Sequence, residues 1–487
     1  MSIKKNNLHI YNSLTRNKEK FIPLNPGVVG IYVCGPTVYG DSHLGHAKSY
    51  ISFDVVVRYL RFLEYKVRYV QNITDVGHLQ SDADEGEDKI AEQARLEQLE
   101  PMEVVENYTR SYFEDMDILN VSRPDISPRA SGHIPEQIEM IETLIKKGFA
   151  YEVAGNVYFA VEKFPGYGKL SGRSLNEMKE GHRVEVQSDK KNPADFALWK
   201  KAEPVHLMQW KSPWGKGYPG WHLECSCMSG KYLGETFDIH GGGMENKFPH
   251  HESEIAQSEA ANEKPFARFW MHNNMVTVDG VKMGKSLGNF TTIKDAVKKH
   301  SPLAIRYFIL GSHYRSTLDF SSDALAAADK GLQKIHAVVS KVFNIQPTRK
   351  EIDHEFENEI EVYKKQFQDA LDDDFNTPRA IAATFDFIKK INTWLSDKAD
   401  KVSYNTYESL VSVLRDYLDG ILGILPDTFK QAEVNVGKLD DIMQLLIDLR
   451  NQLRKEKNFA LSDEIRDRLS AIGITIKDTP EGSVWES

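Results

Sequence analysis

A metal-binding site is the first chemistry that the residue types of this chain offer. Cys34 ends an apolar run, and "PGWHLECSCMSG" supplies Cys225 and Cys227. In "FPHHESEIAQSEAA", a segment expected to be helical, His250 and Glu254 stand four positions apart and therefore share one face. Two cysteines, one histidine and one glutamate would make a tetrahedral zinc site.

The pattern by itself leaves the ligand set open. It does not choose Cys225 over Cys227, or His250 over the neighbouring His251. Each part also has a simpler interpretation. A buried cysteine is usually a small apolar side chain, and a His/Glu pair on a helix is usually a surface pair.

A second candidate site follows the same apolar run. "PTVYGDSHLGH" leads from an expected strand into an expected helix, where free backbone N–H groups and the helix dipole favour an anion such as phosphate. His43 and His46 could meet that phosphate, and Gly45 would let a flat base approach the backbone. The simpler interpretation is an ordinary strand–loop–helix turn with exposed histidines.

Lysines in a later loop would suit the same chemistry. "DGVKMGKSLGN" begins with Asp279-Gly280, a pair typical of a tight type I′ hairpin turn, and continues with Lys282 and Lys285. Loop lysines beside a phosphate site can neutralise charge that develops in phosphoryl or nucleotidyl transfer. Taken alone, the segment would be a solvated basic loop.

The elements that must position these residues form a βαβ unit. "GVVGIYVC" is a continuous apolar run, "HAKSYISFDVVVRYLRFLEY" has apolar residues at helical spacing, and "KVRYVQNITD" is expected to be a second strand. This order predicts a parallel sheet with flanking helices. "ETFDIHGGGM" is expected to be a further strand that ends in a glycine-rich turn. Cys34, Thr74 and His240 then fall at strand ends, where functional residues of such sheets gather.

The pattern of expected strands and helices along the whole chain predicts an α/β protein of several domains. A Rossmann-like parallel-sheet domain over residues 1–320, the expected catalytic domain, contains an insertion at about 100–215 with mixed helices and short strands. Amphipathic helical segments over 321–428 predict an α-helical bundle. A small α+β domain over 436–487 combines a helix pair with a β-like tail.

Composition narrows the class of protein. The 487 residues are 41% hydrophobic and 27% charged, as in ordinary globular proteins. No window approaches the roughly 18 apolar residues of a membrane span, and the N-terminus lacks the apolar core of a signal peptide. Three cysteines provide no disulfide framework, so we expect a cytoplasmic protein with no membrane contact. The net charge of −10 argues mildly against a nucleic-acid partner without excluding one, because binding depends on a local basic patch.

Taken together, the two loops resemble the HIGH and KMSKS signatures of class I aminoacyl-tRNA synthetases. They stand here as His43-Leu44-Gly45-His46 and Lys282-Met283-Gly284-Lys285-Ser286. "YVCGPTVYGDSHLGHAKSY", "YVQNITD", "GYPGWHLECSCM", "FDIHGGGMENKFPHHESEIAQSEA" and the tail "KNFALSDEIRDRLSAIGITIKDTPEGSVWE" narrow the resemblance to the cysteinyl-tRNA synthetase family, over nearly the whole chain.

The resemblance implies a role for each motif. The metal ligands would be Cys34, Cys225, His250 and Glu254, with Cys227 and His251 outside the ligand set. The catalytic residues would be His43, His46, Lys282 and Lys285. ATP would contact His43, Gly45, His46, Gly241, Gly242 and Lys285. The amino-acid pocket would include Thr74, Trp221 and His240.

The resemblance also implies the reaction. L-cysteine would be activated by ATP, accompanied by Mg²⁺, to cysteinyl-adenylate, and then transferred to the 3′ end of tRNA(Cys). One zinc ion per chain would select the cysteine thiolate over the serine hydroxyl, which is a poorer ligand. The bundle and residues 436–487 would contact tRNA, with the latter at the anticodon, and the enzyme would be a monomer. A basic stretch in this last part comprises Arg450, Arg454, Lys455 and Lys457.

The sequence departs from the family pattern in three places. Leu44 replaces isoleucine, Gly284 replaces the first serine of KMSKS, and the acidic stretch 81–88 is longer than expected.

The nearest rival function is that of a cysteine ligase that acylates an amine on a small sugar-like acceptor and does not need the C-terminal domain. A non-catalytic RNA-binding relative would not need the intact signature residues. A zinc hydrolase would need an open metal position and a carboxylate base.

Overall fold

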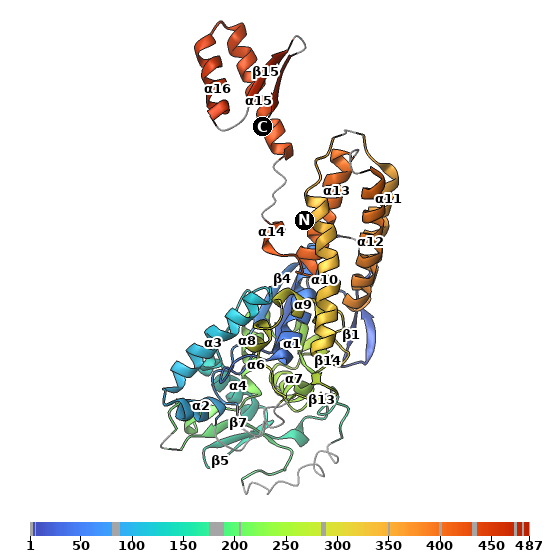
Figure 1. The fold of residues 1–487 in the computed structure, drawn as a ribbon. Helices are drawn as coiled ribbons and strands as arrows, with labels where there is room; N and C mark the ends of the chain where they lie inside the picture. Colours follow the sequence, from blue (N-terminus) through green and yellow to red (C-terminus); the bar gives the residue numbers. More distant parts are fainter. Residues whose placement is uncertain are drawn as a thin grey trace. The chain divides into compact units, whose positions relative to one another are not determined.

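The computed structural model describes residues 3–4, 6–79, 88–174, 189–203, 206–283, 289–348, 351–398, 402–430, 436–471, 475–479 and 482–486. The chain divides into two compact units, Met1–Leu425 and Pro426–Ser487 (Figure 1).

The first unit contains most of the helices. They are α1 (Leu44–Phe62), α2 (Lys89–Glu97), α3 (Pro101–Ile118), α4 (Ile134–Lys146), α6 (Leu223–Leu233), α7 (His250–Asn262), α8 (Ile293–Val297), α9 (Pro302–Leu310), α10 (Ser322–Phe343), α11 (His354–Asp372), α12 (Thr377–Lys398) and α13 (Tyr404–Leu414). A π-helical turn, Arg415–Ile421, continues α13.

Its strands are short. They are β1 (His9–Asn12), β2 (Asn17–Lys20), β3 (Val28–Val33), β4 (Lys66–Gln71), β5 (Ala150–Val153), β6 (Asn156–Phe159), β7 (Phe196–Lys201), β8 (Trp210–Ser212), β9 (Gly215–Pro219), β10 (Phe237–Gly243), β11 (Ala267–Asn273), β12 (Val276–Val278), β13 (Val281–Lys282) and β14 (Leu318–Phe320).

A four-stranded parallel sheet with the order β11-β10-β3-β4 forms the centre of this unit, as the βαβ pattern predicts. In register, Val33 of β3 pairs with Gly241 of β10 and Gln71 of β4, so the carboxyl ends of these strands lie along one edge. The expected glycine-rich turn after His240 is wrong, because β10 continues through Gly243 and every residue in it is buried. His240 therefore lies inside a strand rather than at its end.

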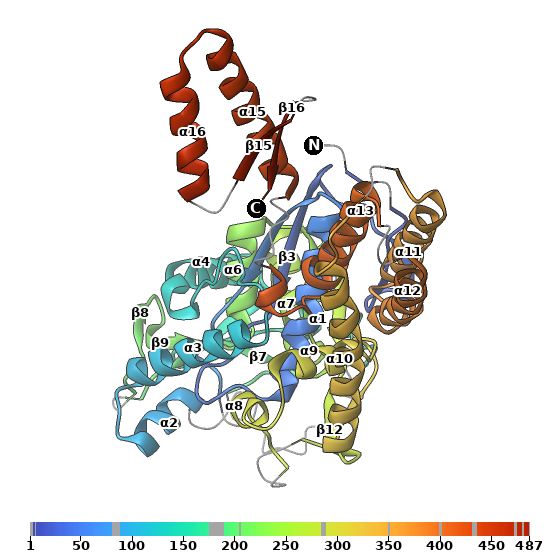
Figure 2. The ribbon, with the colours of Figure 1, turned by 45° about the horizontal axis from the view of Figure 1, so that its top comes forward.

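Helices cover both faces of the sheet (Figure 2). Their close approach explains why two positions of β10 are glycines. Neighbouring strand residues point to opposite faces. A Cβ at Gly241 would lie 2.4 Å from the ring of Phe53 in α1, and a Cβ at Gly242 would lie 2.7 Å from the ring of His251 in α7. Glycine thus lets α1 pack closely on one face and α7 on the other.

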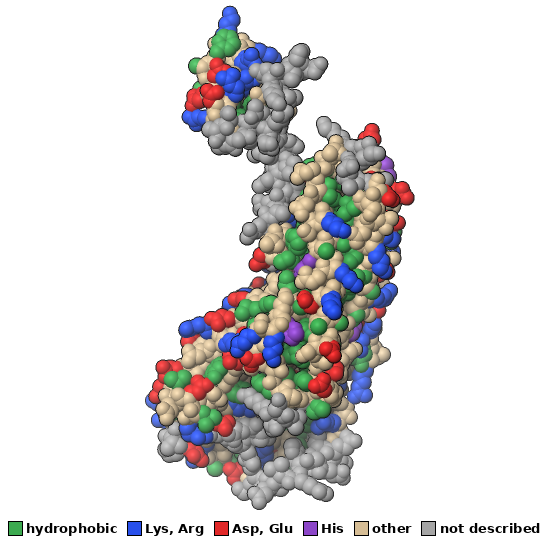
Figure 3. Space-filling view, in the orientation of Figure 1, with side chains coloured by type: hydrophobic (Ala, Val, Ile, Leu, Met, Phe, Trp, Pro, Cys, Tyr) green, Lys and Arg blue, Asp and Glu red, His purple; other side chains and the backbone are tan. Residues whose placement is uncertain are grey.

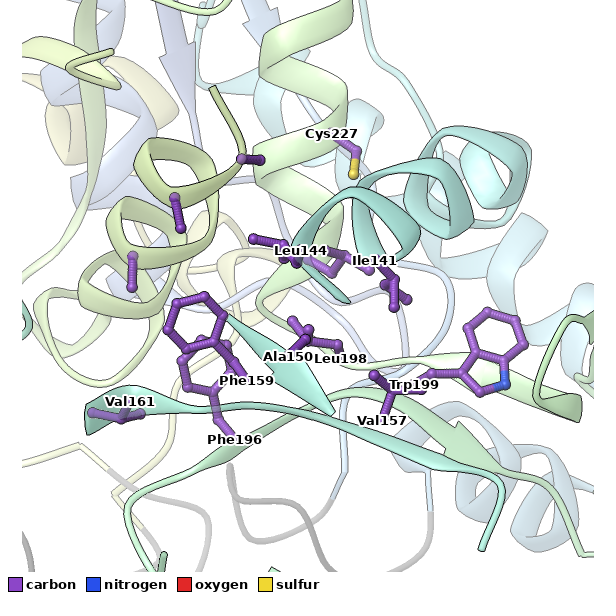
Figure 4. Close-up of a cluster of buried hydrophobic side chains, with 14 of the residues drawn as sticks. Ile141, Leu144, Ala150, Val157, Phe159, Val161, Phe196, Leu198, Trp199 and Cys227 are labelled. Carbon is purple, nitrogen blue, oxygen red and sulfur yellow. The ribbon is translucent and has the colours of Figure 1, made fainter. Parts of the chain in front are cut away.

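The insertion builds an antiparallel sheet with the order β5-β6-β7-β9-β8. Its inner face packs against α4 and α7 through a cluster of buried apolar side chains, shown in Figure 4. The labelled members of the cluster are Ile141, Leu144, Ala150, Val157, Phe159, Val161, Phe196, Leu198, Trp199 and Cys227.

The predicted hairpin at Asp279-Gly280 is confirmed. Strands β12 and β13 pair antiparallel, and φ is +51° at Asp279 and +75° at Gly280, as a type I′ turn requires. The hairpin leads directly into the lysine loop.

A buried ion pair joins α9, which precedes the helical region α10–α13, to α1 beside the sheet. Nη2 of Arg306, in α9, lies 2.5 Å from Oδ2 of Asp54, in α1, and both side chains are fully buried. The same guanidinium donates to the carbonyl oxygens of Asn120 and Leu422, at 2.8 and 2.6 Å. These contacts tie the end of the helical region to α1, whose first turn faces the site described below.

The second unit contains α15 (Val436–Lys455), α16 (Phe459–Ala471) and a hairpin of β15 (Thr475–Thr479) with β16 (Gly482–Glu486). The short helix α14 (Asp427–Lys430) precedes them. Met443, Ile447, Leu469 and Ile476 form its apolar core. Of the basic stretch, Arg450 is only 2% exposed, and Arg454 and Lys455 lie in the last turn of α15.

The helical region shows both basic and acidic side chains on the face drawn in Figure 3. None of the helices searched, which are those in the described parts of the chain, has the length and apolar character needed to cross a membrane.

Candidate active site and metal centre

A cavity of about 320 Å³ opens at the carboxyl ends of β3 and β4, beside the first turn of α1. The predicted site residues on its wall are Cys34, His43, Gly45, His46, Thr74, Trp221, Cys225 and His250. Residues from distant parts of the sequence therefore meet around one space.

Four predicted metal ligands converge at one end of this cavity. One ligand atom from each of Cys34, Cys225, His250 and Glu254 lies within 4.8 Å of the others. The two sulfurs are 3.8 Å apart, and Nε2 of His250 lies 3.1 Å from Oε1 of Glu254. Two thiolates bound at about 2.3 Å to a tetrahedral zinc ion would have sulfurs about 3.8 Å apart, so the donor set and spacing fit zinc. Nδ1 of His250 lies 3.0 Å from His222, which directs Nε2 toward the cluster.

A second group of buried side chains shares two of these ligands: Cys34, Glu254, His240 and His251. Nε2 of His251 lies 3.2 Å from the Cys34 sulfur, and Nε2 of His240 lies 2.7 Å from Oε2 of Glu254. Neither histidine is among the described residues that line the cavity. A metal ion that contacts a substrate must face the cavity, so these histidines are better placed to hold the ligands by hydrogen bonds.

His251 belongs to a buried chain of hydrogen bonds. Its Nδ1 lies 2.8 Å from Nε2 of His272, whose Nδ1 lies 2.8 Å from the hydroxyl of Ser13. If the Ser13 hydroxyl donates, each neutral ring is fixed in one tautomer, and Nε2 of His251 donates to the sulfur of Cys34. In that case the chain orients the thiol of Cys34, a predicted metal ligand.

Burial controls the protonation of the ligand cluster. It raises the pKa of Cys34 to about 12, raises the pKa of Cys225 well above its usual value, and raises the pKa of Glu254. It also lowers the pKa of His250 well below its usual value, with the help of neighbouring histidines. Two thiolates and a carboxylate at such a site call for a divalent cation, whose charge offsets the cost of burying theirs.

Cys227 points away from this cluster. It lies in the apolar core under the insertion, beside Ile141 and Leu144 (Figure 4). Its sulfur lies 3.7 Å from the sulfur of Met140 and from the carbonyl oxygen of Glu136. Cys227 therefore fills the role of a small apolar residue.

Helix α1 begins with a reciprocal cap formed by two histidines of the first signature loop. Nδ1 of His43 accepts from the backbone N–H of Gly45 at 3.0 Å, and Nδ1 of His46 accepts from the N–H of His43 at 3.2 Å. The rings stack with centroids 3.9 Å apart. Because Nδ1 accepts, each neutral ring carries its proton on Nε2, a donor suited to a phosphate oxygen.

Burial and the neighbouring His43 hold the pKa of His46 well below its usual value, so His46 is neutral at pH 7. A Cβ at Gly45 would lie 2.7 Å from the ring of His43. The glycine is therefore required for the cap itself.

The lysine loop lies only partly within the described residues. Met283 lines the cavity, so the hairpin delivers the start of the loop to the site. The backbone of Lys282 belongs to β13, but its side chain, together with Gly284, Lys285 and Ser286, lies outside the described residues. Residues 81–87 of the acidic stretch also lie outside them.

Of the expected amino-acid pocket, the structure brings Thr74 and Trp221 to the cavity wall. The indole of Trp221 stacks between His78 and His250, with centroids 4.1 and 4.3 Å away. His240, Gly241 and Gly242 are not among the described wall residues. His240 instead stacks on Trp270, behind Glu254.

The wall residues that sequence reasoning missed include three with polar side chains close to predicted ones: Asn72, His78 and Glu224. The amide oxygen of Asn72 accepts from the backbone N–H of Gly35, and its NH₂ donates to Oγ1 of Thr74. Glu224 stands next to Cys225 in "HLEC", and His78 follows Thr74 by four residues. Their adjacency to predicted residues was the only available signal, because polar residues at such positions are also common on surfaces.

Two regions of the chain match known protein families. Residues 20–330 match the family described as the catalytic domain of class I (C) tRNA synthetases, and residues 366–426 match the DALR domain. The cysteine–tRNA ligase of Chlorobium luteolum is 59% identical over 98% of this chain and 99% of its own length. That of Deinococcus radiodurans is 50% identical over 99% and 97%.

Solved structures extend the likeness at the level of the fold. The methionyl-tRNA synthetase of Mycobacterium tuberculosis in complex with methionyl-adenylate is similar with a TM-score of 0.58 and 14% identity. The match covers 83% of this chain and 93% of that chain.

Proposed function

The chain belongs to the cysteine–tRNA ligase family of class I aminoacyl-tRNA synthetases, and on that premise we propose how its site selects cysteine. It is an enzyme that joins cysteine to tRNA. In our proposal, Cys34, Cys225, His250 and Glu254 hold one zinc ion at the amino-acid end of the cavity. The observation that carries this proposal is the 3.8 Å separation of the two sulfurs beside the His250–Glu254 pair.

Selection against serine is the problem that this site would solve. A pocket that reads only shape rejects a near-isostere weakly. A bound zinc ion would supply a ligand position that prefers a thiolate to a hydroxyl. Trp221 and Thr74 line the same wall and would limit the size of the side chain that fits.

The first turn of α1 would bind the phosphates of ATP, which Mg²⁺ accompanies. The helix dipole favours an anion, and the Nε2–H groups of His43 and His46, whose Nδ1 atoms accept in the cap, can donate to phosphate oxygens. Lys282 and Lys285 would neutralise charge on the transferring phosphate. No side-chain nucleophile is needed, because the carboxylate of cysteine attacks the α-phosphate and catalysis consists of positioning and charge stabilisation.

We assign transfer-RNA contact to the helical bundle, 321–428, and the anticodon to residues 436–487. Arg454 and Lys455 are candidates for phosphate contacts, whereas Arg450 is too buried for a direct one. We further propose that the enzyme acts as a monomer in the cytoplasm. The three cysteines, all buried and free, suit a reducing compartment.

Charging of total tRNA tests the proposal. We expect ATP-dependent attachment of labelled cysteine and no measurable attachment of serine. Cysteine-dependent pyrophosphate exchange without attachment to RNA would favour the rival ligase with a small acceptor. Loss of cysteine attachment on zinc removal, with recovery on zinc addition, would support the metal's role.

A further inference from the structure

Glu224 presents a buried carboxylate to the cavity with one oxygen that lacks a partner. The residue is 2% exposed and lines the cavity wall. Its Oε1 accepts a hydrogen bond from Oγ1 of Thr74 at 2.5 Å. Its Oε2 is buried and has no hydrogen-bond partner among the described residues. A buried carboxylate in this condition is costly unless a positive or donating group reaches it.

The wall itself offers no cation for that oxygen. Among the described residues that line the cavity there is no lysine or arginine. The amide of Asn72, on the same wall, donates to Thr74 rather than to Glu224. A positively charged partner would therefore have to arrive with a ligand.

The position of Glu224 identifies the part of the ligand that would arrive there. Glu224 and Cys225 are consecutive in the first turn of α6, so their side chains diverge by about 100°. Cys225 turns toward the metal ligands, whereas Glu224 turns toward Thr74, just beyond β4. In cysteine the sulfur and the ammonium nitrogen are separated by only three bonds, which suits two neighbouring receptors of this kind.

We propose that Glu224 receives the α-ammonium group of the substrate cysteine, with Thr74 holding the carboxylate in place. The inference rests on the proposed function, because it assumes that the thiol is bound at the Cys34–Cys225 cluster. Glu224 would then distinguish cysteine from thiols that lack an amino group. Glu245 is the rival carboxylate on the same wall, but it is exposed and lies against Gly243.

The test separates the ammonium from the thiol. The zinc site is loaded with Co²⁺, whose thiolate absorption reports thiol binding without catalysis, and cysteine is compared with 3-mercaptopropionate, which lacks the amino group. We expect Glu224→Gln to weaken cysteine binding by about 10- to 100-fold and to leave 3-mercaptopropionate binding unchanged. The ratio of the affinity for cysteine to the affinity for 3-mercaptopropionate should therefore fall in Glu224→Gln. Thr74→Val should lower this ratio by a smaller factor, and Glu245→Gln should leave it unchanged.

The Co²⁺ spectrum without ligand serves as the control for an intact metal site and should be identical in all variants. Glu224→Gln could weaken the binding of cysteine and of 3-mercaptopropionate equally, or Glu245→Gln could instead remove the preference for cysteine. Either result would overturn the role of Glu224 and leave the proposed zinc site standing. Absence of any cysteine-dependent absorption in the unsubstituted protein would overturn the proposed zinc site and this inference with it.

Discussion

The sulfur atoms of Cys34 and Cys225 lie 3.8 Å apart, although 191 positions separate the two residues in the chain. The first follows β3, and the second lies in the first turn of α6, which packs against that strand. The fold thus brings two thiols to the separation that a shared tetrahedral zinc ion needs. In our proposal, selection of cysteine depends on this pair and on the His250–Glu254 pair beside it.

The two cysteines of "ECSC" provide a matched pair of variants. Cys225→Ser should abolish stoichiometric zinc binding, because one of four ligands becomes a poor donor. Cys227→Ala should retain one zinc per chain and cost only roughly 1–2 kcal/mol of stability, since it opens a small space in an apolar core. Zinc content measured by atomic absorption and unfolding in urea check both. Equal zinc loss in the two variants would contradict the ligand assignment.

The hydrogen-bond chain behind Cys34 should tune metal affinity. His272→Gln breaks the link between Ser13 and His251 and should weaken zinc binding by about 10- to 100-fold, as loss of an outer hydrogen-bond partner typically does. Competition with a chelator measures the affinity. His9→Gln, in β1, serves as the control and should leave it unchanged. The same affinity in wild type and His272→Gln would show that the chain is only structural.

The Asp54–Arg306 pair should make stability depend on acid pH. Burial alone would raise the pKa of Asp54, but the charges of Arg306 and Arg58 outweigh it and hold the pKa below its usual range. A depressed carboxyl pKa stabilises the fold above about pH 3.9, and this contribution is lost as pH falls through the lower pKa of the folded state. Asp54→Asn should therefore cost about 3–5 kcal/mol at pH 7 and much less in strong acid.

Urea unfolding at several pH values measures that difference. Asp125→Asn, which removes an exposed partner of Arg61, should change stability by less than about 1 kcal/mol at every pH. A penalty for Asp54→Asn that does not shrink in acid would contradict the electrostatic explanation.

Close packing at Gly241 should be visible in a double-mutant cycle. Gly241→Ala should destabilise the protein by about 1–3 kcal/mol, because its Cβ would overlap the buried ring of Phe53. Phe53→Leu should recover part of the loss when combined with it, although Phe53→Leu alone is destabilising. Additive effects in thermal unfolding would mean that the ring and the glycine do not interact.

Periodicity and turn chemistry predicted much of the fold but only part of the site. The apolar runs predict the parallel strands because burial on both faces leaves few polar positions, and Asp279-Gly280 predicts its turn because few residues tolerate positive φ at both positions. Helical spacing places His250 and Glu254 on one face, but only the family resemblance chose His250 over His251. His240 was misplaced because a strand of consecutive glycines looks like a turn. Oε2 of Glu224 has no hydrogen-bond partner among the described residues because of the side chains that the fold places around it. No local sequence pattern contains that information.

X-ray absorption at the zinc edge tests the central claim most directly. The isolated protein should show two sulfur neighbours at about 2.3 Å from the metal. Addition of cysteine without ATP should raise the number of sulfur neighbours to three, and addition of serine should leave it at two. An unchanged sulfur count on adding cysteine would contradict selection of the substrate through the metal.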